Sequence, residues 1–195
     1  MNLIVFAHKA EAQNFLKEKT ISQYSKKLPN LYHCDKYYVL FLGKGIGHVT
    51  RDLASATLEL SGKIKQIINM GVSGGLSQEL KLNSIYPIKT CILAPNDLKR
   101  RETFDLQTKS DKLFTCITTQ RMVDTPAYAQ YLHNYADLVD MELWAISAVC
   151  HQLNMPLSAY KLISDYADNP TITKAVKQKA PFYSSLLKEY YTEFI

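Results

Sequence analysis

The sequence predicts an α/β protein: a single three-layer domain with a central mixed, largely parallel twisted sheet flanked by helices. Two observations predict this class. Short apolar runs, typical of buried strands, alternate along the chain with segments whose apolar residues have helical spacing. The 195 residues suffice for one well-buried domain but not for two ordinary ones, and no repeat, low-complexity tract or linker divides them. We therefore expect residues 1–195 to form one domain.

Composition indicates a globular protein, with 47% hydrophobic residues, 21% charged residues and a formal net charge of +5. That mild excess of positive charge neither requires nor excludes an anionic partner. The apolar run near Met1 is too short for a signal peptide, and no run approaches the roughly 18 apolar residues of a membrane-spanning helix. The four cysteines lack zinc-ligand spacing, so we interpret them as buried apolar residues in a reducing compartment. We expect a cytoplasmic protein without a metal or a membrane partner.

The predicted elements follow from these patterns. Apolar runs of strand length occupy residues 3–7, 31–34, 37–42, 66–70, 86–94, 113–118, 138–141 and 160–163. Helical spacing is found in residues 9–17, 48–60, 125–135 and 142–153, and a further helix start is predicted at Asp168-Asn169-Pro170. Asp35-Lys36 predicts a hairpin, residues 43–47 and 71–75 are interpreted as glycine turns, and Pro181 is expected to split the last helical region in two.

Four segments with polar side chains lie where predicted strands end: residues 7–11, 71–75, 140–142 and 164–165. Ligands bind at the carboxyl ends of strands in open α/β sheets. Each segment also has an ordinary explanation, since carboxylates favour exposed helix faces, helix starts and turns. The glycine-rich segments match neither a dinucleotide fingerprint nor a phosphate-binding loop, so we expect no nucleotide cofactor.

Taken together and in this order, the segments resemble the purine nucleoside phosphorylase and nucleosidase superfamily. They are most similar to its bacterial 5′-methylthioadenosine/S-adenosylhomocysteine nucleosidases, and the resemblance runs through most of the chain. The motifs that carry it are Ala7-x-x-x-Glu11, Lys44-Gly45-Ile46-Gly47 and the segment 69–76. The most specific motifs are Val139-Asp140-Met141-Glu142, continuing through Val149-Cys150-His151, and Ile163-Ser164-Asp165-Tyr166-Ala167-Asp168.

The resemblance implies an N-glycosidase that hydrolyses the bond between base and ribose in a purine nucleoside. It implies that Asp165 protonates the base at N7, that Glu142 binds the ribose 2′- and 3′-hydroxyls, and that Glu11 activates the water. It also implies a set of substrate-binding residues: Ala7, His8, Ile46, Val72, Ser73, Gly74, Met122, Val123, Met141, Lys161 and Ser164. Its further implications are a homodimer, a role in methionine salvage and no cofactor.

Three features depart from the pattern of this family. Lys161 occupies a position that is commonly Arg, and an ammonium cannot reproduce a planar guanidinium fork. His8 replaces a residue that is usually apolar. The stretch between Ala94 and Leu113 is shorter than expected, and in the family this region supplies part of the pocket for the 5′ substituent, partly across the dimer interface.

Other functions remain open at this point. A phosphorylase is disfavoured because no Arg precedes residues 71–75, although Lys44 and Lys161 keep it as an alternative. Futalosine hydrolysis fits an altered 5′ pocket, and a nucleoside-binding protein without catalysis would show the same departures. A nucleic-acid partner is not expected, since Lys99-Arg100-Arg101 lies beside acidic residues in a polar segment typical of a solvated surface.

Overall fold

The structure, a computed structural model, describes residues 1–43, 46–94, 102–112, 114–168 and 172–195. Several predicted features therefore lie outside the described residues. They are the turn residues Lys44 and Gly45, the first residue of the strand predicted at 113–118, the basic segment Lys99-Arg100-Arg101, and Asn169-Pro170 of the predicted helix start.

Strands and helices alternate along the described chain. In order they are β1 (Asn2–Phe6), the 3₁₀ helices η1 (Lys9–Ala12) and η2 (Phe15–Lys17), β2 (Ser22–Gln23), β3 (Leu31–His33), β4 (Tyr37–Phe41), α1 (Ile46–Glu59), β5 (Gln66–Gly75), β6 (Ile85–Leu93), β7 (Thr103–Asp105), β8 (Phe114–Thr118), α2 (Pro126–His133), β9 (Leu138–Asp140), α3 (Leu143–Gln152), β10 (Leu157–Asp165) and α4 (Ile172–Phe194). Most predicted elements are present within a few residues of their expected bounds. The predicted hairpin is confirmed, because β3 and β4 pair in antiparallel fashion.

The described strands form one mixed sheet in which β5 has a central place. Strand β10 pairs in parallel along one edge of β5. The other edge is shared, because β1 pairs in parallel with the first half of β5 and β9 pairs in antiparallel fashion with Gly74 and Gly75. The pairs β10–β6, β6–β8 and β8–β9 complete a closed ring of five strands. Strands β1, β4, β3 and β2 extend the sheet outward from this ring.

Residues 71–75 are part of strand β5, so the predicted glycine turn at this place is wrong. The glycines serve close packing instead. A Cβ atom at Gly74 would lie 2.7 Å from the Cβ of Ala167, a distance that real side chains do not tolerate. A glycine inside a strand often marks such a close approach rather than the end of the strand.

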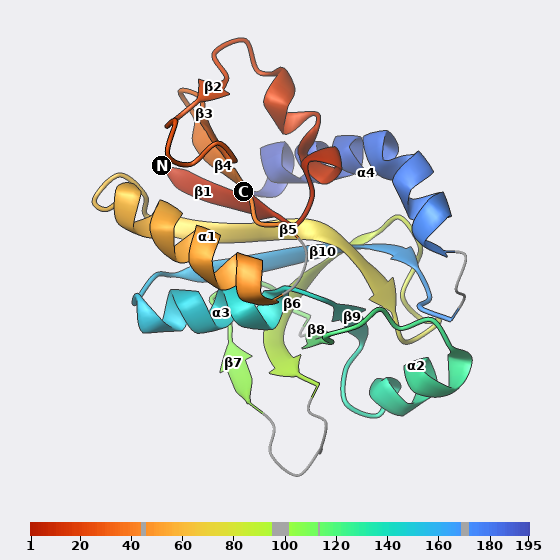
Figure 1. Ribbon diagram of the computed structural model, residues 1–195. Helices are drawn as coiled ribbons and strands as arrows, with labels where there is room; N and C mark the ends of the chain where they lie inside the picture. Colours follow the sequence, from red (N-terminus) through yellow and green to blue (C-terminus); the bar gives the residue numbers. More distant parts are fainter. Residues whose placement is uncertain (44–45, 95–101, 113, 169–171) are drawn as a thin grey trace.

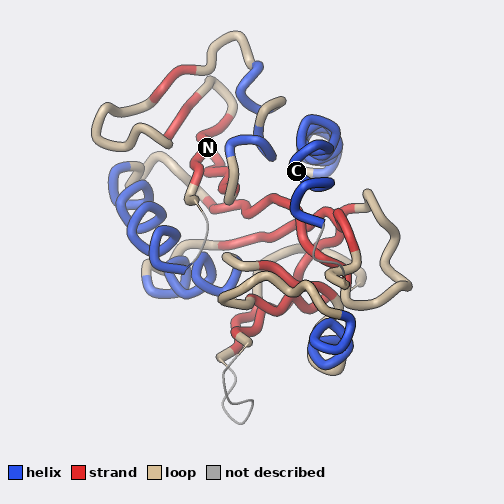
Figure 2. The backbone as a smooth tube through the Cα atoms, turned by 45° about the vertical axis from the view of Figure 1, so that its right-hand side comes forward, coloured by secondary structure: helices blue, strands red, loops and turns tan. Residues whose placement is uncertain are grey.

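Side chains alternate along the central strands and thereby build two apolar layers. In β1, Leu3 and Val5 belong to the cluster that contains residues of α1 and α3, whereas Ile4 and Phe6 belong to the cluster that contains residues of α4. Figure 1 shows α1 and α3 on one side of the sheet and α4 on the other. Figure 2 shows the same flanking of strands by helices from a second side. The predicted three-layer α/β class is confirmed.

Two local predictions are wrong. Residues 9–17 form two short 3₁₀ helices instead of one helix, and between them the Asn14 amide donates to the Ser184 hydroxyl of α4 at 2.9 Å. Helix α4 continues through Pro181 without a break. A proline removes one hydrogen bond of a helix, and the buried Tyr183 and Leu187 fix the following turns against the sheet.

We predict opposite effects for two glycine-to-alanine substitutions. Gly74→Ala should lower the free energy of unfolding by about 1–3 kcal/mol, because the new Cβ forces β5 away from Ala167. Gly47→Ala, in the first turn of α1, has nothing within 4 Å of its new Cβ and should raise stability by roughly 0.5–1 kcal/mol. Urea denaturation of both variants measures the contrast, and equal stabilities would contradict the close packing at Gly74.

Candidate active site

A cavity of about 430 Å³ lies where β1, β5, β9 and β10 end. Because β1, β5 and β10 run parallel, their carboxyl ends meet at one edge of the sheet, where ligand sites of such sheets form. Most of the sequence-predicted site residues line this cavity: Ala7, His8, Glu11, Val72, Ser73, Gly74, Met122, Val123, Met141, Glu142, Ser164 and Asp165. Segments that are far apart in sequence thus contribute to one concave surface.

Two sequence-predicted residues do not line the cavity. Ile46 packs against the apolar cluster of α1 and α3. Lys161 is buried behind the wall, and its Nζ lies 2.8 Å from Oδ2 of Asp140. Successive side chains of β10 point to opposite faces of the sheet. Tyr160 and Leu162 belong to the cluster beneath α4, so Lys161 between them points to the opposite face.

Glu11 lies in η1, directly after β1, and is 6% exposed. Its carboxylate accepts hydrogen bonds from two backbone segments, the residues that follow β1 and strand β5. The His8 amide donates to Oε2 at 3.0 Å, and the Val72 amide of β5 donates to Oε1 at 3.2 Å. Hydrogen bonds from amides to a carboxylate are short and strong, so they fix its orientation.

Asp165 ends β10 beside an irregularity in the strand. The register with β5 shifts between Ile163 and Asp165, so that Ser164 is the extra residue. Such bulges redirect the side chains that follow them and are common next to active sites. The Ala167 amide donates to Oδ1 of Asp165 at 2.8 Å, and Ser164 Oγ lies 2.6 Å from Oδ2.

Burial raises the pKa of Asp165, against the lowering effect of the bonds from Ser164 and Ala167. The surrounding hydrogen bonds accommodate the protonated acid. Ser164 Oγ contacts both Asp165 Oδ2 and, at 3.3 Å, the carbonyl oxygen of Ser73, but a hydroxyl has one hydrogen to donate. A protonated Asp165 can donate to Ser164 Oγ, which then donates to Ser73, and both contacts are satisfied.

Glu142 immediately precedes α3 and is 8% exposed, with its side chain at the cavity. Its carboxylate makes no capping hydrogen bond to the helix. Two other side chains satisfy the first amides of α3. Oδ2 of Asp140 accepts from the Leu143 amide at 2.9 Å, and Oγ1 of Thr118 accepts from the Trp144 amide at 2.9 Å. The Glu142 carboxylate is therefore not used to cap α3.

Sequence reasoning missed one entire wall of the cavity. Helix α4 contributes Val176, Lys177, Ala180 and Tyr183, which share one helical face. The Tyr183 hydroxyl donates to the carbonyl oxygen of Ser164 at 3.3 Å, which links this wall to β10. The helical spacing was visible in the sequence, but only the tertiary structure places α4 over the strand ends. The other missed lining residues are Ala10, Thr119, Val139, Asp140 and Ala167.

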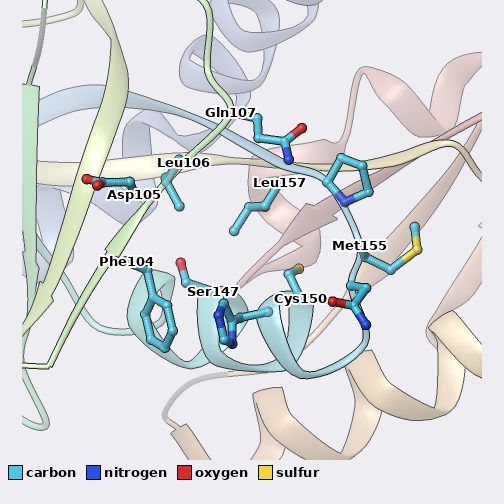
Figure 3. A pocket seen from close by; sticks show the side chains of 11 residues that line it. Phe104, Asp105, Leu106, Gln107, Ser147, Cys150, Met155 and Leu157 are labelled. Atoms are coloured by element: carbon cyan, nitrogen blue, oxygen red, sulfur yellow. The ribbon is translucent and has the colours of Figure 1, made fainter.

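A second cavity, of about 240 Å³, lies between α3 and the segment that begins with β7 (Figure 3). Its lining includes Phe104, Ser147, Cys150 and Leu157 but none of the sequence-predicted site residues. Within the described ranges, no group of three or more His, Cys, Asp and Glu side chains could hold a metal ion. The larger cavity with its carboxyl groups is therefore the candidate active site.

The four cysteines are buried and form no disulfide bond, as predicted. Burial raises the pKa of Cys91 and of Cys150 to about 12, so both remain thiols at neutral pH. Among the helices of the described chain, none has the length and apolar character needed to cross a membrane.

Comparison with known proteins agrees with the motifs. A family model described as the phosphorylase superfamily matches residues 114–195, a segment that includes Glu142 and Asp165. A 5′-methylthioadenosine/S-adenosylhomocysteine nucleosidase of Buchnera aphidicola subsp. Baizongia pistaciae (strain Bp) is 28% identical over 197 residues, which cover 85% of this chain and 78% of the relative.

Solved structures share the fold at low identity. A futalosine hydrolase mutant of Helicobacter pylori strain 26695 superimposes with a TM-score of 0.80 at 17% identity, covering 99% of both chains. A mutant of the Helicobacter pylori nucleosidase, with 5′-methylthioadenosine in its active site, gives a TM-score of 0.79 at 16% identity, covering 99% of this chain and 98% of the other. The family model, the sequence relative and the fold together confirm the resemblance to the purine nucleoside phosphorylase and nucleosidase superfamily that the motifs predicted.

Proposed function

We propose that the protein is a purine nucleosidase that hydrolyses 5′-methylthioadenosine and S-adenosylhomocysteine. The observation that carries the proposal is the convergence of three carboxyl groups, from Glu11, Glu142 and Asp165, on one cavity. The name of the Buchnera relative supports this choice of substrate. Three carboxyl groups supply what cleavage of an N-glycosidic bond needs: an acid for the base, a negative charge beside the sugar, and a base for water.

Asp165 has the properties of the acid in this reaction. A purine leaves more readily when its N7 accepts a proton, so the donor must keep that proton near neutral pH. Burial raises the pKa of Asp165, and the Ser164 and Ala167 contacts hold its carboxyl group at the cavity. Ser164 can accept the hydrogen bond of the acid before transfer and donate to the carboxylate afterwards.

Glu142 and Glu11 act on the sugar. As the bond breaks, the ribosyl group acquires positive charge, which a carboxylate at the ribose hydroxyls stabilises. Glu142, at the start of α3, fits this role. Glu11 is held at the cavity by amides of His8 and Val72, and its carboxylate orients and deprotonates the attacking water. Met141 and the wall from α4 enclose the substrate.

The proposal extends to the oligomeric state, the cellular location and the metabolic role of the protein. We propose a homodimer, and the exposed Met122 at the cavity and Tyr131 of α2, at 41% and 43%, provide apolar surface for a second copy. The free cysteines fit a cytoplasmic location. A nucleosidase of this specificity acts in methionine salvage.

Specific observations bear on two alternative reactions, one of which they support and one of which they disfavour. Futalosine hydrolysis is supported by the shared fold with the Helicobacter pylori futalosine hydrolase and by His8 and Lys177 at the cavity, which suit a more polar 5′ group. Phosphorolysis is disfavoured because the described residues that line the cavity include no arginine. Incubation with methylthioadenosine, S-adenosylhomocysteine, adenosine, inosine and futalosine, with and without phosphate, distinguishes these reactions.

Hydrolysis should proceed without phosphate and should depend on Glu11. We expect Glu11→Gln to bind a purine nucleoside almost as well as the wild type and to lose most turnover, because an amide cannot take the proton of water. Chromatography of released base and sugar measures the products. Strict dependence on phosphate, with a ribose 1-phosphate product, contradicts the proposal.

Asp165→Asn should keep the fold and nucleoside binding but lower kcat by about 10²- to 10⁴-fold, since an amide donates a hydrogen bond but transfers no proton. Thermal melting and isothermal titration provide the controls for folding and binding. If Asp165 only shaped the turn, Asn would be an equally good residue there, and a fully active variant would therefore overturn the acid role.

The pH dependence of activity should report the raised pKa of Asp165. The protonated form is the active one, so activity is present below the pKa of the folded enzyme and declines as pH rises through it. A profile of kcat/KM against pH for the wild type should show this descending limb. The residual activity of Asp165→Asn should lack it, and a limb that persists in the variant assigns the titration to another group.

A further inference from the structure

A buried ion pair adjoins the cavity, with Asp140 in its lining and Lys161 behind the wall, and it is not used in the chemistry described above. It joins Lys161 of β10 to Asp140 at the end of β9, with side chains only 4% and 1% exposed. Two further ion pairs, Arg51–Asp52 and Lys188–Glu18, have side chains that are 18–70% exposed. Removal of two charges from water is costly, so a buried pair is weak evidence for stability and calls for another explanation.

The pair connects strands that are not neighbours. Strand β9 pairs with β5 and β8, whereas β10 pairs with β5 and β6. The Lys161–Asp140 contact therefore crosses the interior of the five-stranded ring. Burial lowers the pKa of Lys161, but the Asp140 carboxylate, together with Cys116 and Glu142, more than compensates, and the pKa lies above its usual range. The Asp140 carboxylate thus favours the charged ammonium form of Lys161.

Asp140 transmits this contact to the first turn of α3. Its Oδ2 accepts from both Lys161 and the Leu143 amide, while its Oδ1 accepts from the Thr118 hydroxyl at 2.6 Å. Oγ1 of Thr118 in turn accepts from the Trp144 amide. Glu142 lies in sequence between Asp140 and Leu143, so its backbone is bounded on both sides by residues of this network.

We propose that the Lys161–Asp140 pair is a positioning element, which fixes the ribose-binding carboxylate of Glu142 relative to the acid Asp165. One end of the pair lies on β10, four residues before Asp165, and the other end holds the turn that carries Glu142. The inference rests on the proposed function, since it concerns the geometry of that same site. Lys161 acts through Asp140 and α3 and does not touch the substrate. Misplacement of a reacting group by about 1 Å can cost on the order of 10²-fold in rate.

The double variant Asp140→Asn/Lys161→Met tests this role. It removes both charges together, keeps the approximate side-chain volumes, and leaves an amide oxygen that can still accept from Leu143. We expect the melting temperature to stay near that of the wild type, kcat to fall at least about tenfold, and KM to change less than about threefold. A folded double variant with wild-type kcat and KM overturns the proposal.

Thr118 offers a second test that does not depend on the folding of the double variant. Thr118→Val keeps the shape but removes the hydroxyl that bridges Asp140 and Trp144, whereas Thr118→Ser keeps the hydroxyl. We expect kcat to fall in Thr118→Val and to be retained in Thr118→Ser, with KM little changed in both. Equal kcat in the two variants contradicts transmission through this network.

The surface pair Glu18–Lys188 supplies the matched control. Its atoms are also 2.8 Å apart, but both side chains are partly exposed and neither lines the cavity. Glu18→Gln/Lys188→Met should leave kcat and KM within about twofold of the wild type. A loss equal to that of Asp140→Asn/Lys161→Met would attribute the effect to ion-pair removal in general and overturn the positioning role.

A structural measurement separates this inference from the proposed function. If the wild type releases no base from any nucleoside of the panel, the proposed function fails, and the positioning role is then decided by the crystal structure of Asp140→Asn/Lys161→Met. A change of about 1 Å or more in the separation of the Glu142 and Asp165 carboxyl groups supports the inference. An unchanged separation overturns it, whatever the activity.

Discussion

The shared edge of β5 is the constraint on which the rest of the structure depends. One strand pairs along one edge with β10 and along the other first with β1 and then with β9. In its glycine-rich second half, Gly74 lies so close to Ala167 that no side chain fits between them, and a Cβ there would also lie 3.3 Å from Val139 of β9. The ring of strands and the outer sheet therefore meet at β5, and the cavity forms where they diverge.

This arrangement explains why each carboxyl group has a different environment. Glu11 reaches across from η1 to the Val72 amide. Asp165 follows a bulge and is held by its own neighbours, Ser164 and Ala167. Glu142 precedes a helix that other side chains cap. Backbone geometry, rather than charge alone, distinguishes the three groups.

The sequence predicted the fold class and most elements because apolar runs and helical spacing report burial directly. It failed where tertiary contacts override local preference. Glycines at 71–75 indicated a turn, but they allow close packing of a strand, and Pro181 indicated a helix break that the buried residues of α4 prevent. The strands β2 and β7 have only two and three residues and lie in polar segments, so no periodicity could identify them.

For the candidate site, the motifs brought together residues whose side chains line one cavity, because each motif lies at the end of a strand or the start of a helix. Lys161 is different. Its place in the motif suggested the cavity, but alternation along β10 turns it toward the ring interior, and pattern alone does not tell which face of a two-sided strand holds the substrate. The face becomes evident only once Tyr160 and Leu162 are seen beneath α4.

The electrostatics of the cavity follow from these placements. The charge of Asp140 is balanced by Lys161 behind the wall, and a protonated Asp165 is neutral. In the proposed reaction, Glu11 and Glu142 provide the negative charge that faces the nucleoside, and Lys177 lies on the wall from α4. Two carboxylates beside a sugar stabilise a ribosyl cation and repel an incoming phosphate, because like charges at close range are costly in a partly buried site. Asp140 engages the Lys161 ammonium behind the wall, so this cation is not presented to the cavity, and the described residues that line the cavity include no arginine.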